Sequence, residues 1–204
     1  MPARYTAPQL LRQEKRLNRS GYRLVAGIDE AGRGPLAGPV VAGAVILRET
    51  SFRNEVNDSK KLSAKKRELA YEEIIRKAII GIGIVDEKTI DEINIYRATI
   101  RAMELAISEL EVQPDYAIVD GRMKISTACP VKCIIKGDSK SLSIAAASII
   151  AKVTRDRIME EQDKLYPQYG FARHKGYPTK DHKKALKDHG PSPIHRLTFN
   201  SVKT

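Results

Sequence analysis

Three strand-like runs of this chain end in a carboxylate that stands beside a glycine. The runs are LVAGIDE, which is followed by AGRG, then YAIVDG, then VKCIIKGD. Functional sites of open α/β sheets gather where strands end. A sheet that brings these three ends together would therefore place four carboxylates at one edge, those of Asp29, Glu30, Asp120 and Asp138. The feature constrains both the topology and the chemistry of the fold.

This acidic set belongs to a strongly basic chain. Lys and Arg number 36 against 25 Asp and Glu, which gives a formal net charge of +11. A positive surface favours phosphate backbones or anionic membranes. The chain has no apolar run long enough to span a bilayer, and residues 1–20 contain no apolar run of signal-peptide length. We expect a cytoplasmic protein that binds nucleic acid and no membrane, although solubility alone also explains a basic composition. An acidic pit in a basic shell suits a metal-dependent enzyme that acts on a polyanion.

Strand-like and helix-like patterns alternate along the chain, which predicts an α/β fold. We expect strands over 24–29, 40–47, 79–85, 116–119 and 131–135, and helices over 7–18, 64–78, 87–111, 138–157 and 181–187. The loop over 31–39 holds no helix, so the first two strands should pair antiparallel and the central sheet should be mixed. No linker or repeat divides the chain. We expect a single domain over 1–204, with a basic helix in 1–20 and a polar C-terminal segment of helix and loop over about 165–204.

The four carboxylates would repel one another if they met without a counter-charge. Two such groups ~5 Å apart repel by roughly 3 kcal/mol at an effective dielectric near 20, and a divalent cation relieves this. An all-carboxylate donor set without His or thiolate fits Mg²⁺ or Mn²⁺ rather than zinc. Because neighbouring side chains of a strand point to opposite faces, Asp29 and Glu30 can share a site only if the chain turns between or just after them. Gly32 and Gly34 permit that turn.

Taken singly, two of these carboxylates have ordinary structural explanations. Asp138 stands before a helical pattern and is typical of an N-cap, while Asp120 before Gly121 is typical of a turn. The same feature at three separate strand ends favours a shared site over separate structural roles.

The cysteines and histidines predict no metal centre. Cys129 and Cys133 form neither a disulfide framework nor a complete zinc site, so we expect both to be reduced. The four histidines, at 174, 182, 189 and 195, lack a metal-ligand spacing. We expect them on the surface or in hydrogen bonds.

The glycine-rich loop AGRGPLAGP indicates close contact with a substrate backbone. It lacks the ending of a P-loop and the spacing of a dinucleotide-binding loop, so we expect no nucleotide cofactor. Gly32 and Gly34 would let backbone amides approach a sugar or phosphate, with Arg33 at the rim. A tight turn between strands explains the glycines equally well but not the arginine between them.

Two further segments carry side chains that suit a nucleic acid. Ser59, Lys60 and Lys61 precede a helical pattern and could hold a phosphate, although a solvated charge run is an equal explanation. Tyr177 stands in the Gly/Pro loop HKGYPTKDH, where its ring could stack on a sugar or base.

Six motifs, in this order, closely resemble the bacterial ribonuclease HII family. They are DEAGRGPLAGPVVAGAV, NDSKKLS, AIVDG, KGDSKSLSIAAASIIAKVTRDR, HKGYPTKDH and PIHRLTF, and the likeness runs from about Gln9 to Val202. The resemblance implies a ribonuclease H-like fold. It also implies a metal-dependent endonuclease that hydrolyses the RNA strand of RNA/DNA hybrids and cuts 5′ of single ribonucleotides embedded in duplex DNA, leaving 3′-hydroxyl and 5′-phosphate ends.

The resemblance also implies roles for individual residues. Asp29, Glu30, Asp120 and Asp138 would hold Mg²⁺ or Mn²⁺, with two ions expected. Gly32, Arg33 and Gly34 would contact the backbone and 2′-hydroxyl at the junction, and Tyr177 the neighbouring sugar. Lys60 and Lys61, with Ser59 beside them, would hold a phosphate of the RNA/DNA hybrid or of the ribonucleotide-containing duplex. We expect the enzyme to act as a monomer.

Two alternatives remain at this point. Ribonuclease HIII carries an additional N-terminal substrate-binding domain, for which the 28 residues before Asp29 are too few. A non-catalytic, basic nucleic-acid-binding protein would have structural acids instead, and its function would survive removal of divalent metal.

Overall fold

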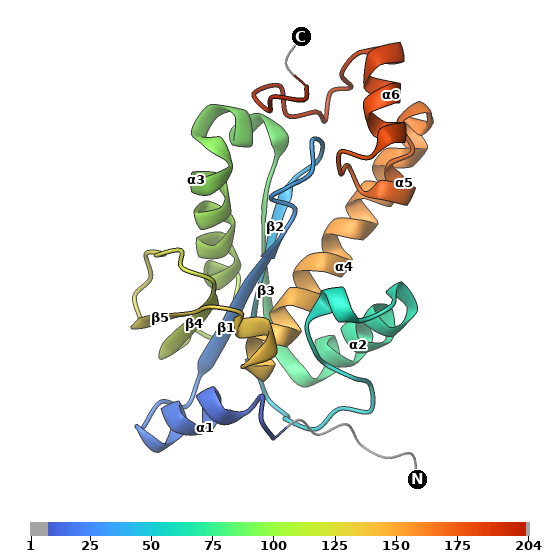
Figure 1. Cartoon of the computed structure of the whole chain (residues 1–204). Helices are drawn as coiled ribbons and strands as arrows, with labels where there is room; N and C mark the ends of the chain where they lie inside the picture. Colours follow the sequence, from blue (N-terminus) through green and yellow to red (C-terminus); the bar gives the residue numbers. More distant parts are fainter. Residues whose placement is uncertain (1–7, 203–204) are drawn as a thin grey trace.

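A five-stranded mixed sheet forms the centre of the molecule in the computed structural model, which describes residues 8–202 (Figure 1). Its order is β3-β2-β1-β4-β5, and the strands are β1 (Val25–Ala31), β2 (Val40–Leu47), β3 (Ala78–Val85), β4 (Tyr116–Asp120) and β5 (Val131–Ile134). The first three strands pair antiparallel, whereas β4 pairs parallel with β1 and β5 parallel with β4. The predicted mixed α/β sheet, with its antiparallel first pair, is confirmed.

Helices cover both faces of this sheet (Figure 1). They are α1 (Arg12–Arg19), α2 (Ala64–Lys77), α3 (Glu87–Ser108), α4 (Leu142–Leu165), α5 (Phe171–His174) and α6 (Lys180–His189), with the short 3-10 turns η1 (Ser59–Lys61), η2 (Gly137–Ser139) and η3 (Pro167–Tyr169). The core on one face includes α3 side chains, and the core on the other includes side chains of α2 and α4. The start of the expected N-terminal helix, residue 7, lies outside the described residues. Across 8–202, every helix is too short or too polar to cross a bilayer.

Glycines on the strands let the helices approach the sheet closely. A Cβ added to Gly43 would stand 2.7 Å from the carbonyl oxygen of Ala147 in α4, and Gly27 meets the same helix. Gly81 and Gly83 of β3 have the same relation to α3. The contacts at Gly27 and Gly43 show that α4 packs closely on the sheet, and they bring the start of this helix against the strand that carries Asp29.

Several helix boundaries differ from those predicted: α1 begins at Arg12 and not at 7, α3 ends at Ser108 and not at 111, and α4 ends at Leu165 and not at 157. The helix expected from Asp138 begins instead at Leu142, and Ser141 is its N-cap, whose hydroxyl accepts from the backbone N–H of Ile144 at 3.2 Å. Asp138 lies in η2, so the N-cap explanation for it is wrong. The long helix expected over 87–111 is interrupted at Asn94, which has φ 66° and whose side chain accepts from the backbone N–H groups of the next segment.

Candidate active site

The strand β1 delivers the first two carboxylates of the site. It continues through Asp29 and Glu30 to Ala31, and the chain turns immediately afterwards at Gly32, which has φ +100°. The turn therefore falls just after the two acids, as predicted. Asp29 is 7% exposed and accepts a hydrogen bond from the backbone N–H of Glu30 at 2.8 Å. The side chain of Glu30 is 13% exposed.

The other two carboxylates come from the ends of the parallel strands. Asp120 is the last residue of β4, and its Oδ1 accepts from the backbone N–H of Gly137 at 2.6 Å. Gly137 begins η2, in which Asp138 is buried. A Cβ on Gly137 would stand 3.3 Å from that Oδ1 and 2.6 Å from Cδ1 of Ile144. Asp120 therefore ties the turn that carries Asp138 to the end of β4, and the lack of a side chain at Gly137 makes the approach possible.

The pKa shifts indicate that the four carboxylates share one electrostatic environment. Burial raises the pKa of Asp29 well above its ordinary value, and the negative charges of Glu30, Asp120 and Asp138 raise it further. Burial also raises the pKa of Glu30, to which Asp120 adds, while Arg33 opposes the rise. The pKa of Asp138 rises through burial and then through repulsion by Asp58 and Asp120. Each shift reflects a buried negative charge with too little positive charge beside it.

The donor chemistry of this cluster fits a hard divalent cation. All four side chains offer carboxylate oxygens, which Mg²⁺ and Mn²⁺ prefer. The Oε2 atom of Glu30 is buried without a hydrogen-bond partner, which is costly unless a positive charge approaches it. Within residues 8–202, no three acidic, His or Cys side chains already converge as a formed coordination cluster.

A cavity of about 290 Å³ opens beside these acids and collects most of the predicted substrate-binding residues. Its lining comprises Asp29, Glu30, Ala31, Gly32, Arg33, Gly34, Ser59, Lys60, Lys152 and Tyr177. Segments that lie far apart in the chain therefore meet at one hollow. Asp120 and Asp138 do not line it, and neither does Lys61, which is exposed on η1.

The rim of this cavity combines an aromatic ring with positive charge. Tyr177 is 42% exposed, and a Cβ on Gly34 would stand 3.6 Å from its ring. Burial would lower the pKa of Lys60, but the neighbouring acids, Asp29 first and then Asp58, outweigh it and raise that pKa. The ammonium group of Lys60 therefore stays positively charged beside the carboxylates.

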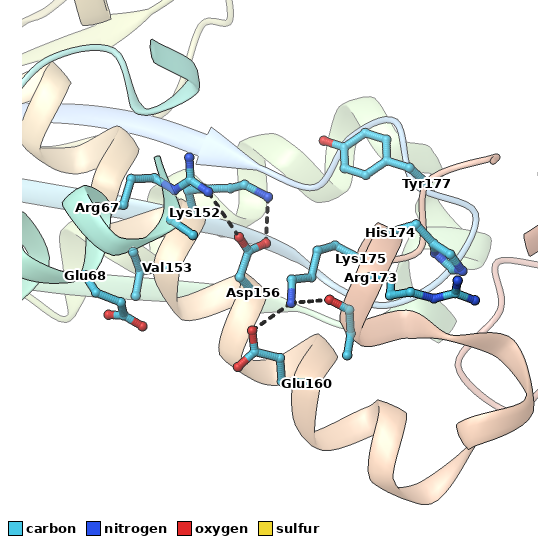
Figure 2. A pocket seen from close by; sticks show the side chains of 12 residues that line it. Arg67, Glu68, Lys152, Val153, Asp156, Glu160, Arg173, His174, Lys175 and Tyr177 are labelled. Carbon is cyan, nitrogen blue, oxygen red and sulfur yellow. Dashed lines mark hydrogen bonds and ion pairs between the residues drawn. The ribbon is translucent and has the colours of Figure 1, made fainter. Parts of the chain in front are cut away.

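A second cavity, of about 530 Å³, shares Lys152 and Tyr177 with the first. Figure 2 shows the side chains of Arg67 and Lys152 directed at Asp156, with Lys152 Nζ 2.6 Å and an Arg67 nitrogen 4.0 Å from its oxygens. Arg67 also donates to the carbonyl oxygens of Ser59 and Leu62, at 2.9 and 2.6 Å, and so fixes the η1 turn. The sequence interpretation overlooked both Arg67 and Lys152, which stand among many other charges on helical patterns.

Two buried arginines that the sequence interpretation also overlooked hold the glycine-rich loop. Arg155 is 1% exposed and donates to the carbonyl oxygens of Ala37, Pro39 and Lys175. Arg196 is 0% exposed and donates to the carbonyl oxygens of Gly32, Arg33, Pro35 and Gly38. Burial lowers the pKa of Arg155 to about 10 and that of Arg196 to about 9. The available signal was their place inside two of the motifs, KVTRDR and PIHRLTF.

Comparisons with known proteins agree on one family. The family model described as "Ribonuclease HII" matches residues 26–202. A ribonuclease HII from Geotalea daltonii is 54% identical over 98% of this chain and 93% of its own length. The crystal structure of ribonuclease H2 from Pyrococcus horikoshii OT3 superposes with a TM-score of 0.74, at 30% identity over 88% of this chain and 95% of that one. Bst-RNase HIII in complex with Mn²⁺ matches with a TM-score of 0.63 at 18% identity, over 88% of this chain and 68% of that one, which shows the fold alone.

Proposed function

Because the chain belongs to the ribonuclease HII family, and is therefore a ribonuclease H that cleaves RNA in RNA/DNA hybrids, we propose that it also cuts duplex DNA on the 5′ side of a single embedded ribonucleotide. The products would be a 3′-hydroxyl and a 5′-phosphate. The observation that carries the proposal is the single hollow at which buried acids, the glycine-rich loop, Lys60 and Tyr177 meet. Such a hollow could hold the phosphodiester that is hydrolysed beside residues that recognise one ribose.

We propose that Asp29, Glu30, Asp120 and Asp138 hold divalent cations, either Mg²⁺ or Mn²⁺. The raised pKa values of Asp29, Glu30 and Asp138 and the unpartnered Oε2 of Glu30 support this, because both reflect buried negative charge without a counter-charge. When bound, such cations activate a water molecule and stabilise the leaving 3′-oxygen in phosphodiester hydrolysis. The hydrogen bond from Gly137 to Asp120 would keep two of the four carboxylates in register for that binding.

The glycine-rich loop would read the 2′-hydroxyl through its backbone. In a planar trans peptide the N–H points away from the carbonyl oxygen of the same unit. Arg196 donates hydrogen bonds to the carbonyl oxygens of Gly32 and Arg33. The N–H groups of the same two peptide units, which belong to Arg33 and Gly34, therefore point away from this guanidinium. Those donors could meet a sugar hydroxyl, which is the group that separates a ribonucleotide from its deoxy neighbour. Tyr177, across from Gly34, would pack on the adjoining sugar.

Lys60 would hold a phosphate of the substrate. Its ammonium group lines the cavity and keeps its charge beside the acids, and ammonium groups bind phosphate oxygens and fix a strand in position. Lys61, which is exposed and outside the cavity, would contribute a longer-range attraction to the polyanion. Ser59 lies beneath them, with its backbone N–H 3.3 Å from the hydroxyl of Ser148. We therefore assign Ser59 to the support of the turn.

The test is cleavage of an end-labelled DNA duplex that holds one ribonucleotide, with Mg²⁺, with Mn²⁺ and with EDTA. We expect one product, cut 5′ of the ribonucleotide, in the presence of either cation and none in EDTA. A uniform RNA/DNA hybrid serves as the positive control for the family activity. Cleavage of that hybrid without any cut at the single ribonucleotide would refute the proposed specificity. Cleavage in EDTA would refute the proposed metal site.

A further inference from the structure

Three of the four histidines form a cluster beneath the loop that carries Tyr177. His182 in α6 and His195 near the C-terminus are 0% and 2% exposed, so a surface position is wrong for these two, whereas the expected hydrogen-bonding role is confirmed. The rings of His174 and His182 stack with centroids 4.5 Å apart. Nitrogen Nε2 of His182 lies 2.9 Å from Nε2 of His195. Buried histidines this close must each adopt a definite protonation state.

The hydrogen bonds determine which nitrogen of each ring carries the proton. The backbone N–H of Ser192 donates to Nδ1 of His195 at 2.8 Å, so this Nδ1 is unprotonated and the proton of neutral His195 lies on Nε2. That Nε2–H must donate to Nε2 of His182, which places the proton of His182 on Nδ1. Nδ1 of His182 lies 2.9 Å from the carbonyl oxygen of Tyr177 and donates to it. The bonds therefore run in one direction, from Ser192 through two rings to Tyr177.

His174 follows the same logic and fixes the preceding residues of the loop. The backbone N–H of Gly176 donates to its Nδ1 at 3.2 Å, so its Nε2 carries the proton and donates to the carbonyl oxygen of Tyr169 at 2.8 Å. The carbonyl oxygen of Gly176 in turn accepts from the backbone N–H of Leu36 at 2.8 Å. The loop before Tyr177 is therefore tied both to the histidine cluster and to the glycine-rich loop.

The carbonyl oxygen of Tyr177 accepts two hydrogen bonds, one from His182 and one from the backbone N–H of Thr179 at 2.8 Å. The bond to Thr179 is local and closes a turn within the loop. The bond to His182 connects the loop to the interior, because His182 is anchored in α6 and in turn by His195. The orientation of the peptide after Tyr177 therefore depends on a side chain that never reaches the cavity.

We propose that His182 and His195 are positioning residues that hold the Tyr177 ring over the glycine-rich loop through this directed chain of hydrogen bonds. The inference rests on the proposed reading of a ribonucleotide by Tyr177. Neither histidine touches the cavity, so neither takes part in the chemistry. Their contribution is to discrimination between a single ribonucleotide in DNA and a uniform hybrid.

This chain of hydrogen bonds requires the rings of His182 and His195 to be neutral. A second proton on His182 would set two N–H groups against each other at the 2.9 Å contact between the Nε2 atoms. A second proton on His195 would lie on Nδ1, against the backbone N–H of Ser192 at 2.8 Å. The titratable side chains that contact these rings are His174 from α5 and Tyr169 from η3, and His189 lies against Tyr169. Burial lowers the pKa of both histidines, that of His195 to about 4. Both histidines are therefore uncharged at neutral pH, and the chain of hydrogen bonds is maintained.

The first test does not depend on activity. Nitrogen-15 NMR of the histidine rings in the wild-type protein at pH 7 should show the proton of His182 on Nδ1 and those of His195 and His174 on Nε2. Exposed His189 supplies the reference for an unconstrained ring. A proton on Nε2 of His182 would overturn the proposal even if the protein cleaves every expected substrate.

The second test is a double-mutant cycle on cleavage. His182→Phe keeps a ring but removes the donor, and should lower the ratio of single-ribonucleotide to uniform-hybrid cleavage about tenfold, in line with the loss of one buried hydrogen bond. His182→Asn returns an N–H at the position of Nδ1 and should recover most of that ratio. Combined with Tyr177→Ala, His182→Phe should cause no further decrease.

The cycle has a matched control in the same helix. His189→Asn changes an exposed histidine of α6 and should leave the ratio unchanged. If the losses from His182→Phe and Tyr177→Ala multiply in the double variant, or if both substrates lose activity equally, the histidines do not act through Tyr177. If wild-type enzyme cleaves the uniform hybrid but never the single ribonucleotide, the proposed function fails instead, and the NMR result still decides the hydrogen-bond chain.

Discussion

The carboxylate edge of the sheet and the arginine-held loop beside it both bury charge, but they do so in opposite ways. Each guanidinium of Arg155 and Arg196 is surrounded by backbone carbonyl oxygens that accept its N–H groups. The carboxylates of Asp29, Glu30 and Asp138 are largely removed from solvent, and their burial together with neighbouring negative charges raises their pKa values. The protein itself supplies hydrogen-bond partners for the buried arginines, but it does not supply enough positive charge for the carboxylates.

The difference separates a structural use of buried charge from a functional one. A buried charge whose hydrogen bonds are all supplied by the protein stabilises a particular backbone shape. A buried cluster of like charges costs stability and is retained where something else supplies the counter-charge. The arginines therefore stabilise the loop, whereas the acids leave negative charge uncompensated, as the proposed cation site requires. Substitutions in the two regions should affect different quantities.

The largest effect is expected from Asp120→Asn, which should lower cleavage by on the order of a thousandfold or more because a proposed cation ligand is lost. The amide oxygen can still accept from Gly137, and one repelling charge is gone, so the metal-free protein should unfold at an equal or higher urea concentration. Cleavage kinetics and urea unfolding measure the two quantities. Asp188→Asn, on the exposed end of α6, is the control, and near-normal turnover of Asp120→Asn would contradict the proposed site.

Arg196→Met should show the reverse pattern, with stability as the principal loss. It leaves the carbonyl oxygens of Gly32, Pro35 and Gly38 without their donor, which should lower the free energy of unfolding by about 3 kcal/mol. Arg196→Lys should recover little, since one ammonium group cannot replace a planar fork. Urea unfolding with exposed Arg173→Met as control measures the effect. An unchanged midpoint would show that Arg196 does not hold the loop.

A smaller effect should distinguish the neighbouring lysines. In an Asp120→Asn background that prevents cleavage, Lys60→Ala should weaken hybrid binding about fivefold and reduce the salt dependence of the affinity by about one ion. Lys61→Ala, its exposed neighbour, should weaken binding less than about twofold. Fluorescence anisotropy at several salt concentrations measures both. Equal losses would remove the distinction between a lysine in the cavity and one outside it.

The smallest expected effect is on the pH dependence of stability. The pKa of His195 is about 4 in the folded protein against an ordinary 6.5. Its contribution to stability is therefore complete above pH 6.5 and is lost as the pH falls towards 4, because the unfolded chain binds a proton that the folded chain excludes. The buried acids, whose pKa values are raised, oppose this trend. Urea unfolding between pH 7 and 4 should thus show a shallower decrease for His195→Asn than for wild type, while His189→Asn should match wild type.

Local patterns were enough to predict most of the fold. The strand limits and the start of α2 follow from neighbours in the sequence, and the structure has them nearly where expected. The interruption of α3 at Asn94 escaped prediction because its apolar spacing continues across the break. The later start of α4 escaped for a related reason, since Asp138 and Ser141 are both acceptable N-caps in sequence.

Some residues of the candidate site could likewise be predicted from local sequence, and others could not. The carboxylates and the glycine-rich loop could be predicted because they stand at the ends of predicted strands. Arg155 and Arg196 could not be found in this way, because most of their partners are backbone carbonyl oxygens of a loop that is distant in sequence, for example Gly38 for Arg196. A carbonyl group is present at every residue, so no residue type in the sequence marks it as a partner.

The sequence by itself determined the mixed sheet, and it proposed the four acids of the candidate site, since both inferences depend on short-range periodicity and on residue types that few structural roles require. The tertiary structure alone decided which buried charges are satisfied and which are not. That outcome depends on the spatial arrangement of separate segments. The loop over 31–39 receives hydrogen bonds from Arg155 and Arg196, whereas the pKa of Asp29 is raised by its burial and by the charges of three other acids. The energy of a buried charge is set by its surroundings rather than by its own identity.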